Sequence, residues 1–152
     1  MLSAGKVFEK KLLGECPLKI GGFMYFVDSI KLIITATRRL QLKEDRYTEF
    51  VKEFINVLSK KLSCNNKNIE FFSALETPLD NYHGVDGFFV FWKNSKKNIC
   101  RFATIDVSLR QKVSFRANFL VTDRDIIEKK AIEIANYLKK NKKGRCRNFL
   151  II

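Results

Sequence analysis

The chain has 152 residues, of which 46% are hydrophobic, and its 29 Lys and Arg against 16 Asp and Glu give a formal net charge of +13. A chain of this length and apolar content can bury about two thirds of its unfolded surface within one domain, which excludes a globally disordered protein. Because the basic excess is spread along the chain and not confined to a tail, a polyanion such as nucleic acid is the favoured partner.

The cysteines argue against a zinc site and against a disulfide framework. They are far apart and form no CxxC pair, and the single histidine, His83, has no Cys within metal-ligand spacing. We expect Cys16, Cys64, Cys100 and Cys146 to act as small buried hydrophobes in a reducing cytosol.

The first 44 residues are expected to form an N-terminal extension. Ser3 to Leu13 has a helical pattern that Gly14 and Pro17 end. Residues 20–42 fit either an amphipathic helix or a β-hairpin, and the sequence leaves both open. Charged residues interrupt this segment, and Lys and Glu precede any long apolar run at the N-terminus. Neither a membrane span nor a secretory signal is therefore expected, and the protein is predicted to be cytoplasmic with no membrane partner.

Residues 45–62 carry a stronger helical pattern, with apolar residues at helical spacing and Asp45 as a candidate N-cap. Glu49 and Glu53 lie one turn apart beside the apolar stripe, and Glu53 falls nearer to its edge. A polar turn ends this helix. A short strand is predicted at residues 69–75, followed by a loop to Gly84.

The segment from Val85 to Lys112 contains two apolar runs joined by a polar turn, which predicts a β-hairpin. Asp86 opens the first run, and Asp106 lies deep in the second. Carboxylates on two neighbouring apolar strands are costly to bury and repel each other, and a divalent cation is the usual compensation. The alternative is that Asp86 is a turn residue and Asp106 an exposed aspartate paired with a nearby Lys or Arg.

The C-terminal part completes the expected order of elements. An apolar run, Phe119 to Val121, precedes a helix predicted at residues 123–140, with Thr122 or Asp123 as its N-cap. A basic turn ended by Gly144 follows, and the last strand is predicted at residues 147–152.

From Asp45 onward the expected order is helix, strand, strand, strand, helix, strand, with one acid opening the second strand and another inside the third. This arrangement resembles the core of the PD-(D/E)xK, or restriction-endonuclease-like, nucleases. The resemblance covers residues 45–152 and implies a single α/β domain with an αβββαβ core. In such a core a central mixed four-stranded sheet is flanked by helices, and residues 1–44 would form an extra N-terminal segment.

The resemblance also implies site residues. Asp86 in Val85-Asp86-Gly87 matches the family's first metal-binding aspartate, and Asp106 in Ile105-Asp106-Val107-Ser108 matches its second acid. Glu53 or Glu49 would match the acid that many members place on the first core helix.

The chain departs from the family at the motif lysine, where it has Ser108. The first candidate to replace that lysine is Lys112. In a straight strand Lys112 would lie roughly 20 Å from Asp106, at about 3.3 Å per residue, so it could serve only if the chain bends after Leu109. Lys129 and Lys130 on the second helix are the alternatives.

Together these assignments imply a nuclease that cleaves phosphodiester bonds of DNA or RNA with Mg²⁺ or Mn²⁺, DNA being favoured. Asp86 and Asp106 would hold the metal, and Lys112 and Glu53 would complete the catalytic group. A metal in that place polarises the phosphate and lowers the pKa of its bound water. A homodimer would suit a duplex, which has two strands to cut. Two alternatives are a catalytically inactive nuclease-like domain that binds nucleic acid through charge, and a basic α/β subunit of a larger assembly.

Overall fold

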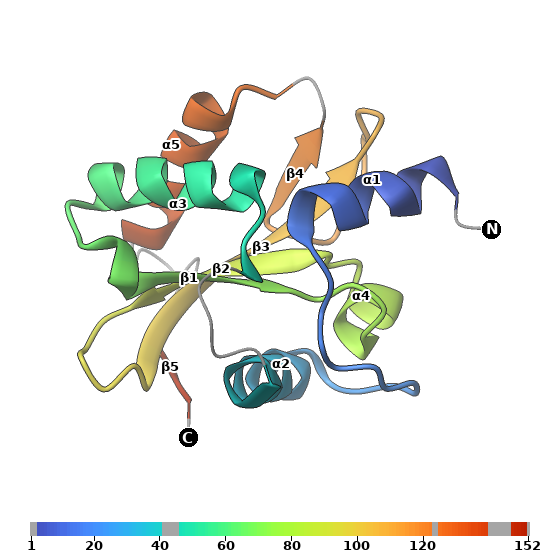
Figure 1. Ribbon diagram of the computed structural model, residues 1–152, viewed down its shortest axis with the longest axis horizontal. Coiled ribbons are helices and arrows are strands. Elements are labelled where there is room, and N and C mark those ends of the chain that lie inside the picture. The colour runs from blue at the N-terminus through green and yellow to red at the C-terminus, as the bar shows by residue number, and fades with distance from the viewer. Residues whose placement is uncertain (1–2, 41–45, 123–124, 140–146, 152) are drawn as a thin grey trace.

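A mixed β-sheet with helices on both faces is the framework of the protein (Figure 1). The computed structural model describes residues 3–40, 46–122, 125–139 and 147–151. The helices are α1 (Ala4–Leu13), α2 (Phe26–Leu40), α3 (Glu49–Leu62), α4 (Pro78–His83) and α5 (Ile127–Lys139), with a 3₁₀ turn, η2, at Asn66–Asn68. The strands are β1 (Ile69–Ser73), β2 (Gly87–Trp92), β3 (Ile99–Ser108), β4 (Phe119–Thr122) and β5 (Phe149–Leu150).

The strands lie in the order β1-β2-β3-β4, and β5 pairs with the first residues of β3. β2 pairs antiparallel with both β1 and β3, and β4 runs parallel to β3 with Ile105 opposite Phe119. The α/β class, the mixed sheet and the β2–β3 hairpin are as expected from the sequence. The sheet has five strands and not four, because Phe119–Thr122 forms a strand of its own before α5. A short helix, α4, also separates β1 from β2, so the observed order contains two more elements than the predicted one.

Each face of the sheet is covered by its own set of helices. In Figure 1, α1, α3 and α5 lie above the sheet and α2 and α4 lie below it. The upper core joins Phe54 of α3 and Ile134 of α5 to Phe89 and Ile105 of the sheet. The lower core joins α2 to the opposite side of the same strands, at Phe88, Trp92 and Phe102 among others. Successive side chains along β2 and β3 therefore point into the upper core and the lower core in turn, because side chains alternate between the two faces of a strand.

The helix boundaries follow local signals. Ser3 caps α1 by accepting from the Lys6 N–H, and Gly14 ends the helix. The ambiguous segment 20–42 contains α2, whose buried side chains are spaced at three and four residues. α3 begins later than predicted, at Glu49, with Thr48 as its N-cap; Asp45 lies outside the described residues.

The predicted helix 123–140 is also shorter than expected. It begins at Ile127, after an Asp125 carboxylate that accepts from the N–H and the hydroxyl of Thr122. Thr122 ends β4 and is not the N-cap of α5, while Asp123 and the basic residues 140–146 lie outside the described residues. The last strand spans only Phe149–Leu150 of the predicted 147–152.

The described cysteines carry free thiols, with Cys16 and Cys100 buried and Cys64 half-buried. Cys146 lies outside the described residues. Within the part of the chain that the structure describes, no helix combines the length and apolar character that crossing a bilayer would need.

Candidate active site

Asp86 is held at the junction of three strands. It follows Gly84, which ends α4 with a φ of 67°, and directly precedes β2. Its backbone N–H donates to the Ile105 carbonyl at 2.9 Å, and its carbonyl accepts from the Ala74 N–H at 2.8 Å. The Asp86 backbone is thereby fixed between the end of β1 and the end of β3.

Gly87, the next residue, allows the close packing at this point. A Cβ on Gly87 would lie 2.4 Å from the Phe71 Cζ atom, which no side chain could tolerate without displacing the ring. The Asp86-Gly87 pair therefore places a carboxylate where β2 begins and lets the Phe71 ring close the core directly behind it.

The structure brings Asp86 and Asp106 into contact. Asp86 Oδ2 accepts from the Val107 N–H at 2.8 Å, and the carboxyl of Asp106 is close enough to raise the pKa of Asp86. Asp86 is 4% exposed and Asp106 8% exposed. Two buried carboxylates so close together repel each other, which favours a protonated Asp86 in the metal-free protein.

Burial and neighbouring negative charges favour a proton on Asp86. Burial raises the pKa of Asp86 to about 9, and Glu9, Asp80 and Asp106 add to the rise, while the Val107 N–H opposes it. Asp86 therefore ionises readily only if a cation arrives to compensate its charge.

Lys112 lies at this pair. Its Nζ atom is 3.1 Å from Asp106 Oδ2, although the two residues are six apart in a region that begins as a strand. The chain turns because β3 ends at Ser108, whose Oγ accepts from the Arg110 N–H at 3.2 Å. A serine that bonds its own backbone two residues on promotes such a turn. Ser108 thus helps to return Lys112 to the acids.

The glutamate near the acids is Glu9 of α1, not Glu53. Burial, then Asp80, raises the pKa of Glu9, and Asp106 and Lys112 also act on it, so Glu9 lies within electrostatic reach of the pair. Glu53 is on the exposed side of α3, and Glu49 is exposed and pairs with Lys52 at 3.3 Å. The expected role of Glu53 stays a prediction, and Glu9 is a further acid that the sequence did not indicate.

The other candidates lie elsewhere. Lys130 pairs with Asp125 and Glu133, and Lys129 is exposed on α5. His83 is part-buried, with its Nε2 atom 2.7 Å from the Met24 carbonyl oxygen, so its ring is engaged on the α2 side of the sheet.

Chemically, the arrangement is a buried carboxylate pair with one ammonium and two further acids around it. Among the described residues, no group of three or more His, Cys, Asp or Glu is arranged as a ready-made metal cage. A pair of carboxylates still suits a hard cation such as Mg²⁺, which usually keeps several waters and takes only one or two protein carboxylates. The raised pKa of Asp86 fits this interpretation, because Lys112 pairs with Asp106 and leaves the Asp86 carboxyl without a counter-charge among the described ion pairs.

Known proteins give no further guide. The chain matches no family model, and neither a curated protein nor a solved structure resembles it significantly.

Proposed function

We propose that this protein is a metal-dependent nuclease that hydrolyses phosphodiester bonds of DNA or RNA at Asp86, Asp106 and Lys112. The observation that carries the proposal is the contact between two buried carboxyl groups with a lysine ammonium 3.1 Å from one of them. Two neighbouring buried carboxyl groups destabilise a fold through desolvation and mutual repulsion, so they are expected chiefly where a function requires them.

Each residue has a role that follows from its place. Asp86 and Asp106 would bind Mg²⁺ or Mn²⁺, which polarises a phosphate oxygen and acidifies bound water. Lys112 would leave Asp106 when the metal neutralises that carboxylate, and its ammonium would then stabilise negative charge that develops on the phosphate. Its 44% exposed side chain can make that movement. Glu9 would act across a water, because no described three-acid ligand group includes it.

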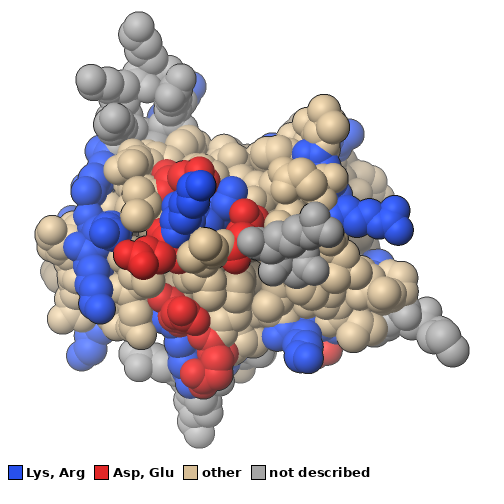
Figure 2. All heavy atoms as spheres, turned by 90° about the horizontal axis from the view of Figure 1, so that it is seen from above, with Lys and Arg blue, Asp and Glu red and all other residues tan. Residues whose placement is uncertain are grey.

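The +13 charge supports a nucleic-acid substrate, with DNA retained as the favoured one. On the face shown in Figure 2, acidic side chains gather in one region, and basic side chains lie among them and along one edge. The row of basic side chains along that edge suits contact with a polyanion. A homodimer remains the prediction for a duplex substrate.

One observation favours a second candidate, a nuclease-like domain that binds nucleic acid without cleaving it. The Lys112 ammonium already neutralises Asp106, so the lysine could serve only as a fixed counter-ion. In that case the acids would bind no metal and nucleic acid would be held by charge alone.

The cleavage experiment compares five single variants with the wild type, using labelled single strands, duplexes, branched DNA and RNA with Mg²⁺ or Mn²⁺. Asp86→Asn and Asp106→Asn each remove one ligand charge at constant size and should lower the cleavage rate by at least about 100-fold. Asp28→Asn, an exposed acid on α2, is the matched control and should leave the rate unchanged.

The two glutamates give a sharper comparison. Glu9→Gln should lower the rate by about tenfold, since Glu9 acts on the site through solvent and charge, whereas Glu53→Gln should have no effect. If the pure wild type binds nucleic acid but cuts none of these substrates, the non-catalytic candidate replaces the nuclease.

A further inference from the structure

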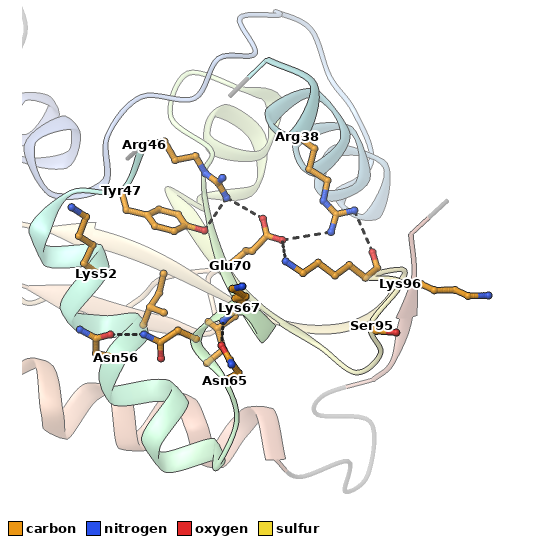
Figure 3. Close-up of a pocket in the computed structure, with 14 residues that line it drawn as sticks. Arg38, Arg46, Tyr47, Lys52, Asn56, Asn65, Lys67, Glu70, Ser95 and Lys96 are labelled. Carbon is orange, nitrogen blue, oxygen red and sulfur yellow. Dashed lines mark hydrogen bonds and ion pairs between the residues drawn. The ribbon is translucent and has the colours of Figure 1, made fainter. Parts of the chain in front are cut away.

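A second charged feature lies at the other end of the sheet. A cavity of about 740 Å³ opens along the outer edge of β1, between α2 and α3. The basic residues that line it come from α2, the approach to α3, α3 itself, η2 and the β2–β3 turn. In Figure 3, Arg38 and Arg46 point toward Glu70, whereas the Lys96 side chain extends outward. Its cationic residues are Arg38, Arg46, Lys52, Lys67, Lys96 and Lys97.

One half-buried carboxylate, that of Glu70, organises three of these cations. Glu70 accepts from Arg46 Nη2 at 3.1 Å and from Lys97 Nζ at 3.3 Å, and Arg38 Nη2 lies 3.6 Å away. Burial alone would raise the pKa of Glu70, but Lys97, Arg38 and Arg46 more than offset it and hold that pKa below its usual value. Glu70 therefore stays ionised and positions the guanidinium groups.

Arg38 and Arg46 also have N–H donors that no described hydrogen bond uses. The described hydrogen bonds of Arg46 all run from Nη2, to Tyr47, Glu70 and the Phe71 carbonyl. Arg38 Nη2 is a buried nitrogen that makes no hydrogen bond within the described residues. A guanidinium has five N–H donors in a planar fork, so both arginines have donors that Glu70 does not use.

The rest of the wall is held rigidly. Asn94 Oδ1 accepts from the N–H groups of Asn98 and Ile99, which fixes the turn that carries Lys96 and Lys97. Arg38 also stacks on the Trp92 ring at 4.3 Å and donates to the Lys97 carbonyl. Because these groups are ordered before a ligand arrives, binding costs less conformational entropy.

We propose that this cavity binds the phosphate groups of a nucleotide unit, within a nucleic-acid strand or as a free nucleotide. Six cationic residues and one carboxylate line it, and a planar arginine fork matches the oxygens of a phosphate. The volume falls in the range of small-molecule sites, so it admits a whole nucleotide and not only an ion. The Tyr47 ring and the apolar Ile55 and Ile69 line the same cavity and offer a surface for a sugar or base.

The site is separate from the acid pair. Glu70 lies opposite Val90, four residues along β2 from Asp86, or about 14 Å at ~3.4 Å per residue. The proposal deepens the nuclease assignment if the ligand is a strand, but its test needs neither metal nor cleavage.

The experiment measures binding of a fluorescein-labelled 12-nucleotide DNA strand in EDTA, with Asp86→Asn as the background. The test variant adds Lys67→Gln and Lys96→Gln, two exposed cavity lysines; the control instead adds Lys31→Gln and Lys129→Gln, which are exposed and lie outside the cavity. Both lose the same charge. The cavity variant should bind at least tenfold more weakly and show a salt slope smaller by about two, whereas the control should change affinity less than threefold.

Competition then identifies the source of the phosphate. Adenosine triphosphate that displaces the strand, with affinity lost in the cavity variant alone, supports a free-nucleotide site. A strand that resists the nucleotide but still needs Lys67 and Lys96 supports a strand site. Equal losses in both variants, or equal displacement by an acidic peptide of the same charge as the strand, would overturn the proposal, because either result means unspecific attraction of anions.

Discussion

Asp86 makes the stability of the protein depend on pH. Its pKa is about 9 in the folded chain, against an ordinary value of 3.8, because it is buried beside other acids. Between these values the folded state holds a proton that the unfolded chain has released. Stability from this group is therefore complete below pH 4 and is lost as the pH rises toward 9.

We expect Asp86→Asn to remove this dependence. The amide oxygen can still accept from the Val107 N–H, while the second charge disappears. At pH 8 without metal, the melting temperature should rise by roughly 2–6 °C, and its decline between pH 5 and 9 should flatten. Thermal unfolding across that pH range measures both, with Asp28→Asn as control. An unchanged slope in Asp86→Asn would show that Asp86 does not hold the proton.

Of the residues in the candidate site, the sequence indicated Asp86 and Asp106 but not Glu9. Aspartates within apolar β-runs are conspicuous because propensity and burial both disfavour them, and the hairpin register then places Asp86 beside Asp106. Glu9 carried no comparable signal. A glutamate in an amphipathic helix is ordinary, and only the packing of α1 near the end of β3 brings it toward the acids.

Among the elements, the end of β3 determines whether Lys112 can reach Asp106. The strand period predicts Lys112 far from Asp106, and the turn after Ser108 brings it to 3.1 Å. That turn depends on the local hydrogen bond between the Ser108 side chain and the backbone. The sequence indicated the turn only through the polar residues of this segment.

Lys112→Ala should separate catalysis from metal binding. If the ammonium stabilises charge on the phosphate, the cleavage rate should fall by about 100-fold. Affinity for Mn²⁺ should stay equal or increase, because Lys112 no longer competes for Asp106. Lys129→Ala is the control. Parallel kinetics and Mn²⁺ titrations measure the two effects, and weaker Mn²⁺ binding in Lys112→Ala would argue against this role.

Other elements were less predictable for a shared physical reason. The helix α2 and the strand β4 are decided by tertiary packing: one covers the lower face of the sheet and the other joins β3 in parallel. A run of three apolar residues before Thr122 is too short to distinguish a strand from a lead into a helix. Long periodic segments such as α3 and α5 were recognisable, although their ends moved by several residues.

For the whole molecule, two chemically opposite centres occupy opposite ends of β1 and β2. The acid pair lies where β2 begins, and the basic cavity lies beside the start of β1. The net charge of +13 predicts attraction to polyanions but locates neither centre. Only the sheet register shows that the carboxylates are grouped away from the main basic cavity.

The central claim is that Asp86 and Asp106 form a site for a divalent cation, and Mn²⁺ binding tests it most directly. The paramagnetic resonance signal of free Mn²⁺ disappears on binding, so titration at pH 8 gives the stoichiometry and affinity without any substrate. We predict one Mn²⁺ per wild-type chain, and at least tenfold weaker binding in Asp86→Asn and in Asp106→Asn but not in Asp28→Asn. Wild-type protein that binds no Mn²⁺, or that binds it equally well in all three variants, would contradict the claim.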